Sequence, residues 1–344
     1  MIEAPADAPG LQYVAVSAGG PVVEHERGFA DLALRRPMAA ATTLMAYSMS
    51  KTITAAAVLT LVEDGAIGLD ESIDRYLDGN PYGTAITVRQ LLAHTSGIPN
   101  PLPLRWVHPA DLDAGFDEAA ALESVLRKHP SASSKPGAQF AYSNIGYWLL
   151  GPIVERASGR SFTTYVKERV LEPLAIAPED LAYAIVDPGR HAAGYLERWS
   201  AFNLMKGFLI DRALIGERCG AWIEIKPHQL NGPAFGGLVG TARGFGKFLS
   251  DQLRPRSAVL GEAARALFYE PQQTRPARSI PMTLGWHVGS MAGSRFFYKE
   301  GGGGGFHSMM RLYPERGIGT VVIANATGFD AGACLDAMDP GSMV

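Results

Sequence analysis

Cysteine is scarce in this chain: only Cys219 and Cys334 occur among its 344 residues. Two thiols cannot form the disulfide framework that stabilises many small secreted proteins. Neither thiol lies in a Cys-x-x-Cys pair or beside a Cys/His cluster with metal-ligand spacing. We therefore interpret both as ordinary thiols and predict no metal site.

Long apolar runs and a basic leader are also missing. The longest apolar runs, such as 55–62, end well before the roughly 18 residues that a membrane-spanning helix needs. The segment 1–7 carries acids and a proline where a secretory signal would place Lys or Arg before an apolar core. We expect no membrane span and a cytoplasmic location, with the loss of an export signal as the alternative.

The chain has no excess of positive charge. It carries 31 Lys and Arg against 34 Asp and Glu, a formal net charge of −3, and it has no basic run that could neutralise a phosphate backbone. Nucleic acid is therefore not expected as a partner. Hydrophobic residues make up 47% of the chain and charged residues 19%, which is ample apolar surface for a folded core.

Extended segments are predicted near both ends of the chain and helices between them. The expected strands are 11–16, 21–28, 282–288, 295–298, 306–312 and 317–324. The expected helices are 52–64, 88–94, 117–129, 144–158, 162–171 and 235–249. This order predicts an α+β fold, with an antiparallel sheet built from both termini and flanked by helices. The sheet domain would comprise 1–65 and 227–344, and a mostly helical domain over 66–226 would be inserted beside it, leaving a cleft.

A Ser-x-x-Lys motif, Ser48 to Lys51, lies where a loop enters the apolar helix predicted over 52–64. Residues three apart on a helix share a face, so the Lys51 amine can reach the Ser48 oxygen. A serine hydroxyl becomes a good nucleophile when a neighbour accepts its proton, and a desolvated lysine can do so because burial lowers its pKa. For an isolated motif, the alternative is a helix-capping serine and a solvated lysine.

Tyr142-Ser143-Asn144 is the only Tyr-x-Asn in the chain, and it immediately precedes the helix predicted over 144–158. A phenol at this place can relay the proton of the serine, and the amide can orient a substrate carbonyl or hold the lysine. The alternative is a helix-capping asparagine beside a packed tyrosine.

A third motif, Lys299-Glu300-Gly301, continues through a run of glycines to Phe306. It ends an extended segment, so Lys299 can project from an edge strand and the bare glycine backbone can admit a ligand closely. A flexible linker is the alternative, but a linker is not expected between two consecutive strands of one sheet.

In this order and spacing, the three motifs resemble the serine β-lactamase superfamily, in particular class C β-lactamases, DD-peptidases and family VIII carboxylesterases. The resemblance covers roughly 10–326 and includes connecting segments. Those segments are 69–77, 91–99, 135–151, 235–238 and 311–325. The resemblance implies a β-lactamase/transpeptidase-like fold and a hydrolase that uses no metal or organic cofactor.

The resemblance also implies roles for residues at matching positions. Ser48 would be the acylated nucleophile, Lys51 the amine that activates it, and Tyr142 a general base that later acts as an acid. Asn144 and Lys299 would bind substrate. The choice of Lys51 or Tyr142 as the base is left open.

The glycines of the third motif match the family as well. Gly301 falls at the glycine of that motif, and the backbone N–H of Gly302 would complete an oxyanion hole with the N–H of Ser48. Glu300 departs from the family pattern, which places Thr, Ser or Gly there. Its anion would oppose a substrate carboxylate, although strand alternation could turn it away from the cleft.

Two other features are weighed and set aside. His94 and His307 are interpreted as structural, because no acid is expected to orient either ring. The apolar stretch 199–210 is expected in the core, with a lid or acyl pocket as the alternative.

Together these observations predict a serine hydrolase that forms an acyl-enzyme on Ser48 and acts on a small-molecule ester or amide. A carboxylesterase for small to medium acyl esters is favoured. The alternatives are an amidase, a DD-peptidase or a weak β-lactamase, and a non-catalytic binding relative.

Overall fold

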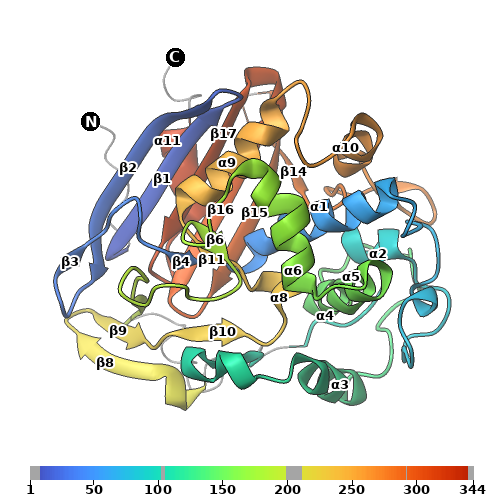
Figure 1. Cartoon of the computed structure of the whole chain (residues 1–344), viewed down its shortest axis with the longest axis horizontal. Helices are drawn as coiled ribbons and strands as arrows, with labels where there is room; N and C mark the ends of the chain where they lie inside the picture. Colours follow the sequence, from blue (N-terminus) through green and yellow to red (C-terminus); the bar gives the residue numbers. More distant parts are fainter. Residues whose placement is uncertain (1–7, 102–104, 199–210, 292, 340–344) are drawn as a thin grey trace.

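A seven-stranded antiparallel sheet joins the two ends of the chain in the computed structural model (Figure 1). The structure describes residues 8–101, 105–198, 211–291 and 293–339. The strand order is β14-β15-β16-β17-β1-β2-β3, so the first strand pairs with the last, with Leu11 opposite Ala324. This arrangement confirms the predicted α+β fold with a sheet built from both termini.

The strands of this sheet are β1 (Gly10–Ser17), β2 (Gly20–Asp31), β3 (Arg36–Pro37), β14 (His287–Met291), β15 (Ser294–Gly303), β16 (Phe306–Tyr313) and β17 (Ile318–Ala324). Smaller sheets contain β4 (Leu44–Met45), β5 (Val107–Pro109), β6 (Leu181–Ala182), β7 (Gly194–Glu197), β8 (Ile215–Cys219), β9 (Trp222–Ile225), β10 (His228–Leu230), β11 (Val239–Gly240), β12 (Gln273–Thr274) and β13 (Arg278–Ser279). Within the described residues, the α-helices are α1 (Ser50–Glu63), α2 (Val88–Leu92), α3 (Glu118–Lys128), α4 (Asn144–Trp148), α5 (Leu150–Ser158), α6 (Phe162–Val166), α8 (Pro233–Gly236), α9 (Ala242–Leu253), α10 (Glu262–Tyr269) and α11 (Ala331–Met338).

Helices cover both faces of the large sheet (Figure 1). Side chains alternate along each strand, so one strand contributes to two cores. In β1, Val14 and Val16 join the large core that includes α1 and α9. Tyr13 and Ala15 join a smaller core against α11. The sheet is therefore the middle layer of the molecule.

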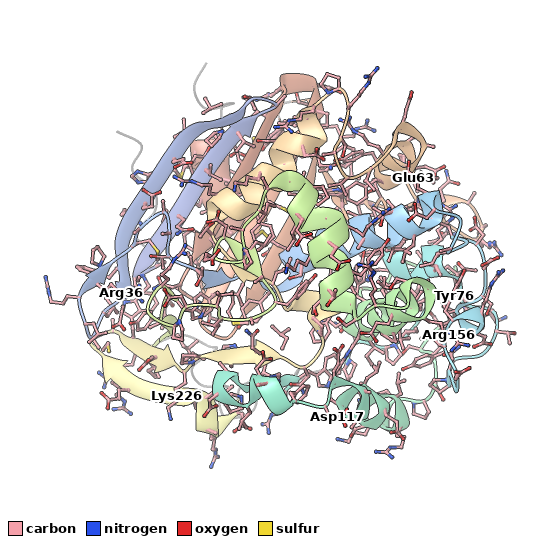
Figure 2. All side chains as sticks on the ribbon, in the orientation of Figure 1. Arg36, Glu63, Tyr76, Asp117, Arg156 and Lys226 are labelled. Atoms are coloured by element: carbon pink, nitrogen blue, oxygen red, sulfur yellow. The ribbon has the colours of Figure 1, made fainter. Side chains whose placement is uncertain are left out.

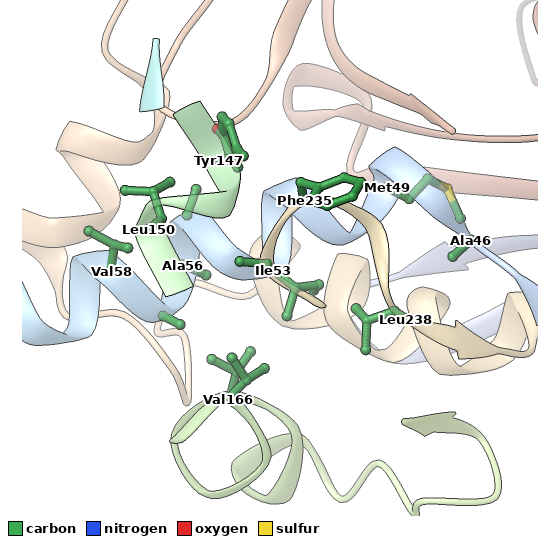
Figure 3. Packing of buried hydrophobic residues seen from close by; sticks show 14 of the residues in the cluster. Ala46, Met49, Ile53, Ala56, Val58, Tyr147, Leu150, Val166, Phe235 and Leu238 are labelled. Atoms are coloured by element: carbon green, nitrogen blue, oxygen red, sulfur yellow. The ribbon is translucent and has the colours of Figure 1, made fainter. Parts of the chain in front are cut away.

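Helix α1 is buried along almost its whole length, as its Ala- and Leu-rich sequence predicts. Its residues from Ser50 to Leu61 are all buried. Figure 3 shows Ile53, Ala56 and Val58 among side chains of other helices, including Leu150 of α5. Small alanines let these neighbours approach closely, and the packing fixes the direction in which the helix start points.

Charged side chains lie mainly at the surface (Figure 2). The labelled residues Glu63, Asp117, Arg156 and Lys226 are exposed. Lys51 and Lys299 are different, because each has 0% exposure. Burial of a lysine is unfavourable unless its amine is hydrogen-bonded or neutral, so both positions call for an explanation.

Most predicted elements occur, but one predicted helix was wrong. The segment expected as one helix over 235–249 forms α8 and α9 with strand β11 between them. Val239 and Gly240 of β11 pair with both β4 and β6, and this pairing overrides the helical pattern. The last two strands begin and end within one residue of the prediction. The strand expected over 282–288 begins only at His287, the one expected over 295–298 extends to Gly303, and α10 and α11 were not predicted.

The middle of the chain contains α2 to α6 and also small sheets that the sequence did not indicate. Strands β7, β9 and β8 form one of these sheets. The division at 66–226 stays a prediction. The stretch 199–210, interpreted as core or lid, lies outside the described residues.

No helix among the described residues combines the length and apolar character needed to cross a bilayer.

Candidate active site

Ser48 lies in a short 3-10 turn, Tyr47–Met49, directly before α1. Tyr47 adopts a left-handed backbone conformation with φ 46°, which is costly for a bulky residue. Neighbouring contacts hold this conformation. The Tyr47 phenol donates to the Gly304 carbonyl at 2.8 Å and lies 2.8 Å from His228 Nε2. The strained turn leaves Ser48 partly exposed, while Tyr47 and Met49 on either side of it are buried.

The residue before this turn is tied to the large sheet. Ser308 of β16 donates to the carbonyl of Ala46 at 3.1 Å, and the Ala46 amide donates to Leu238 at 3.0 Å. Gly301 of β15 packs directly against the same segment. A Cβ on Gly301 would lie 2.0 Å from the Ala46 oxygen and 2.9 Å from the Ser48 nitrogen. Only a glycine therefore permits this approach of strand and turn.

The amine of Lys51 lies at the centre of the predicted site. Its Nζ is 2.9 Å from Ser48 Oγ, 2.7 Å from Asn144 Oδ1 and 2.5 Å from the carbonyl oxygen of Phe235. An amide oxygen and a backbone carbonyl can only accept, so each takes one N–H of the amine. The third direction, toward Ser48, holds an N–H when the amine is charged and a lone pair when it is neutral.

Burial, and then the nearby charge of Lys299, lowers the pKa of Lys51 well below its ordinary value. This direction favours the neutral amine, whose lone pair then faces the hydroxyl of Ser48. The rings of Tyr142, Tyr147 and Phe235 surround the amine with centroids at 5.0, 5.5 and 5.6 Å. Aromatic faces stabilise a nearby cation, so the same surroundings tolerate the ammonium when it forms.

The phenol of Tyr142 donates to Ser48 Oγ at 2.9 Å. Burial raises the pKa of this phenol far above its ordinary value, the hydrogen bond to Ser48 lowers it, and Glu300 raises it further. The phenol therefore keeps its proton at neutral pH and acts as a donor. The ring of His94 lies against that of Tyr142, with centroids 4.2 Å apart.

His94 is a buried structural residue, as the sequence predicted. Its Nδ1 accepts from the amide of Ser143 at 3.1 Å, and burial lowers its pKa well below the ordinary value. Ser143 in turn caps α4 by accepting from the Gly146 amide at 3.0 Å. These contacts fix Tyr142 and Asn144 on either side of Ser143.

Lys299 approaches the same phenol from β15. Its Nζ lies 5.0 Å from the Tyr142 ring centroid and 3.5 Å from His287 Nε2. Burial lowers its pKa to about 7, although Glu300 raises it. Lys299 thus lies next to Tyr142 at the site, but it makes no direct hydrogen bond to Ser48.

A cavity of about 370 Å³ lies beside Ser48, and its wall is largely apolar. Its apolar lining comes from Trp106, Leu196, Leu214, Ile225, Leu230 and Phe235. Ser48, Asn144, Gly302 and His307 contribute the polar part. Ser48 and the predicted oxyanion residue Gly302 therefore face one space large enough for a small or medium substrate.

Glu300 and His307 correct one expectation from the sequence. No acid was expected near His307, but Glu300 Oε1 lies 2.6 Å from His307 Nε2. The two strands place them together, because His307 of β16 is opposite Gly302, two residues after Glu300 on β15. His307 lines the cavity, so it belongs to the candidate site and is not only a structural residue.

Sequence reasoning missed several residues that shape the site. Phe235 contributes its carbonyl to Lys51, and Tyr47 supports the strained turn. The sequence marks the segment 235–238 only as a family-like connection. No local pattern marks Leu214 or Ile225 as cavity residues, because tertiary folding brings them to Ser48.

The described residues contain no group of three or more His, Cys, Asp or Glu arranged to hold a metal ion.

Comparison with known proteins adds an independent observation. The family model described as Beta-lactamase matches residues 1–339. Penicillin-binding protein 4* of Bacillus subtilis (strain 168) is 24% identical over 317 residues, covering 91% of this chain and 67% of the relative. A D-aminopeptidase of Brucella anthropi is 31% identical over 173 residues, covering 50% of this chain and 33% of the relative. The chain is thus shorter than both relatives.

Solved structures show the same fold. D-amino acid amidase from Ochrobactrum anthropi SV3 superimposes with a TM-score of 0.80 at 22% identity, covering 98% of this chain and 94% of the other. An octameric penicillin-binding protein homologue from Pyrococcus abyssi has a TM-score of 0.78 at 23% identity, covering 98% and 74%.

Proposed function

Because this chain belongs to the Beta-lactamase family of serine hydrolases, we propose that it hydrolyses carboxylic esters through an acyl-enzyme on Ser48. The observation that carries this proposal is the position of one oxygen. Ser48 Oγ lies 2.9 Å from both Lys51 Nζ and Tyr142 OH, beside a largely apolar cavity. The acyl group of the substrate would occupy this cavity.

Lys51 is the proposed base for acylation. The neutral amine accepts the hydroxyl proton as Ser48 Oγ bonds to the substrate carbonyl carbon. The ammonium that results donates to Asn144 and Phe235 and faces three aromatic rings. The protonated phenol of Tyr142 transfers its proton to the leaving oxygen as the bond to the acyl carbon breaks, and Lys51 then reprotonates the phenol.

Deacylation reverses these transfers. Water attacks the acyl carbon as one of its protons passes to Lys51, and the Lys51 ammonium then gives a proton to Ser48 Oγ as the ester bond to the enzyme breaks. The backbone N–H groups of Ser48 and Gly302 would stabilise the oxyanion in both steps, and losing one such donor typically costs about 10²- to 10³-fold in rate.

Amide hydrolysis is the second candidate. The likeness to D-aminopeptidase and D-amino acid amidase favours it. The site also contains what an amide requires, because a departing amine must receive a proton and Tyr142 is held as a donor next to Ser48. An ester makes a smaller demand on this donor, since an alkoxide or phenolate leaves more easily.

The test is a panel of nitrophenyl esters of increasing acyl length, with intact-mass detection of an adduct during turnover. We expect an acyl adduct on the peptide containing Ser48, and neither adduct nor turnover in Ser48→Ala. Ser131→Ala, which changes an exposed loop serine, is the matched control and should behave like wild type. Ester turnover that persists in Ser48→Ala would contradict the mechanism.

The same enzyme preparation should be tested on amides of D- and L-amino acids, a D-Ala-D-Ala peptide and nitrocefin. Faster turnover of an amide than of the best ester would identify the second candidate as the main activity. An absence of labelling by a fluorophosphonate probe, together with no turnover of any substrate, would instead favour a binding protein.

A further inference from the structure

The rim of the active site beside β15 carries a carboxylate. Glu300 occupies the strand position between buried Lys299 and Gly301, and its side chain is 48% exposed. It does not line the apolar cavity, although its neighbours Gly302 and His307 do. Its carboxylate therefore lies just outside the space proposed for the acyl group.

Groups of both signs surround this carboxylate and together keep it ionised, because its pKa is lowered, chiefly by the hydrogen bond with His307. His307 contacts one of the two carboxylate oxygens, since its Nε2 lies 2.6 Å from Oε1. A second carboxylate, the exposed Asp330, is close enough to oppose the ionisation of Glu300. Lys299 contributes little compensating charge above pH 7, because burial lowers its pKa to about that value.

Glu300 affects Tyr142, the residue that protonates the leaving group in the proposed mechanism. After burial and the hydrogen bond to Ser48, Glu300 is the next cause that shifts the pKa of Tyr142. In the proposed mechanism Tyr142 protonates the leaving atom. Along β15, Gly302 lines the cavity and Lys299 Nζ lies 5.0 Å from the Tyr142 ring centroid, so Glu300 occupies the strand between them. A substrate whose acyl group fills the cavity would extend its leaving group past Glu300 toward Tyr142.

We propose that Glu300 makes this enzyme selective for substrates whose leaving group carries a positive charge, such as esters of amino alcohols. This inference rests on the proposed function and names its substrate class. A cation next to the scissile bond gains from Glu300 and Asp330, whereas an anion there is repelled. The half-exposed carboxylate suits this purpose, because it is ionised and open to a ligand.

The expected size of this preference follows from the partial exposure of the Glu300 side chain. Ion pairs near the protein surface are worth little to about 1 kcal/mol, so we expect a threefold to fivefold preference at low salt. The preference should shrink as ionic strength rises, because salt screens exposed charges.

The test uses two isosteric esters with one acyl group: choline hexanoate and 3,3-dimethylbutyl hexanoate. They differ only in the charge of the leaving group. We expect wild type to show a higher kcat/KM for the choline ester. Glu300→Gln should abolish this preference, which is measured as the ratio of kcat/KM for the two esters within one variant and so does not depend on the basal rate. Glu315→Gln removes one exposed carboxylate at the distant end of β16, and it should retain the preference.

Four outcomes separate the possibilities. Hydrolysis of both esters at equal kcat/KM by wild type would overturn this inference but leave the acyl-enzyme intact. A preference that survives in Glu300→Gln would also overturn it. In a second pair, phenylalanine methyl ester and methyl 3-phenylpropionate, the charged member carries its charge on the acyl side. If Glu300→Gln affects only that pair, the assignment to the leaving group is wrong. Failure of wild type to hydrolyse the neutral ester or acylate Ser48 would count against the proposed function itself.

Discussion

Lys51 and Lys299 approach the same phenol ring: the Nζ of each lies 5.0 Å from the ring centroid of Tyr142. One lysine comes from α1 and the other from β15, and both are fully buried. Two cations this close repel each other, and Lys299 is the second cause, after burial, of the lowered pKa of Lys51. This repulsion therefore favours the neutral amine of Lys51 beside Ser48.

Removing Lys299 should move the pH dependence of the reaction. Lys299→Met deletes a charge that lowers the pKa of Lys51, so the pKa of Lys51 should rise. The acidic limb of kcat/KM, measured with a neutral ester, should therefore shift to higher pH. Lys247→Met, which alters a partly exposed lysine of α9, should leave the limb where it is in wild type. A shift of the Lys299→Met limb to lower pH would contradict the proposed role of Lys51.

The same substitution should change how stability depends on pH. Lys299 has a pKa of about 7 in the folded protein, and the unfolded chain holds the proton up to about pH 10.4. Between these values the unfolded state binds more protons, so stability rises with pH. From pH 7 to pH 9, the free energy of unfolding of wild type should rise by about 2 kcal/mol more than that of Lys299→Met. Urea denaturation at the two pH values measures this difference, and equal slopes would argue against a depressed pKa.

Lys51→Met should remove the base and keep most of the side-chain volume. We expect kcat/KM to fall by about 10²- to 10⁴-fold, the usual range for a general base. The substitution also leaves Asn144 Oδ1 and the Phe235 carbonyl without this donor, so some stability will be lost. Circular dichroism and thermal unfolding should show a folded protein. Lys167→Met, at an exposed lysine, is the matched control, and comparable activity in the two variants would refute the assignment.

Gly301 and Gly302 should differ sharply in their tolerance of a methyl group. In Gly301→Ala, the new Cβ meets the Ala46 oxygen at 2.0 Å, so β15 and the Ser48 turn must separate. In Gly302→Ala, it meets His307 Cδ2 at 3.2 Å, and a small movement of the ring relieves the contact. Both variants keep the backbone N–H. Ester hydrolysis should fall more than about 10²-fold in the first, as for loss of an oxyanion donor, and much less in the second. Equal losses would show that close packing at Gly301 does not position the site.

Glu300→Thr should improve the use of substrates that carry a carboxylate. Removing the anion removes a repulsion at the rim, and threonine is a residue that related enzymes place in this motif. We expect the ratio of kcat/KM for nitrocefin to that for a neutral nitrophenyl ester to rise about tenfold, provided the substrate carboxylate is partly desolvated near this position. If wild type turned over a cephalosporin as fast as its best ester, the proposed repulsion between Glu300 and a substrate carboxylate would be contradicted.

Much of the fold could be predicted from the local sequence. The glycine turn at 17–20 separates and predicts β1 and β2, the turn at 314–317 does the same for β16 and β17, and the extended run before the glycines predicts β15. The Ala- and Leu-rich segment predicts α1, because it is apolar almost all round and ends at a glycine. The failure at 235–249 is also physical: Val239 and Gly240 lie inside the segment expected as one helix, but they pair with two other strands as β11, and neither residue favours a helix strongly.

The sequence by itself determined which reactive groups are present and which of them lie close along the chain. Ser48 and Lys51 are one helical turn apart, and Tyr142 and Asn144 flank the residue that caps a helix. Only the tertiary structure decided that these two pairs meet at the oxygen of Ser48. It also decided that Glu300 contacts His307 and that the cavity wall comes from segments far apart in the chain. The physical reason is that these contacts join segments far apart in the chain, and their geometry depends on the packing of α1 against the sheet and the neighbouring helices.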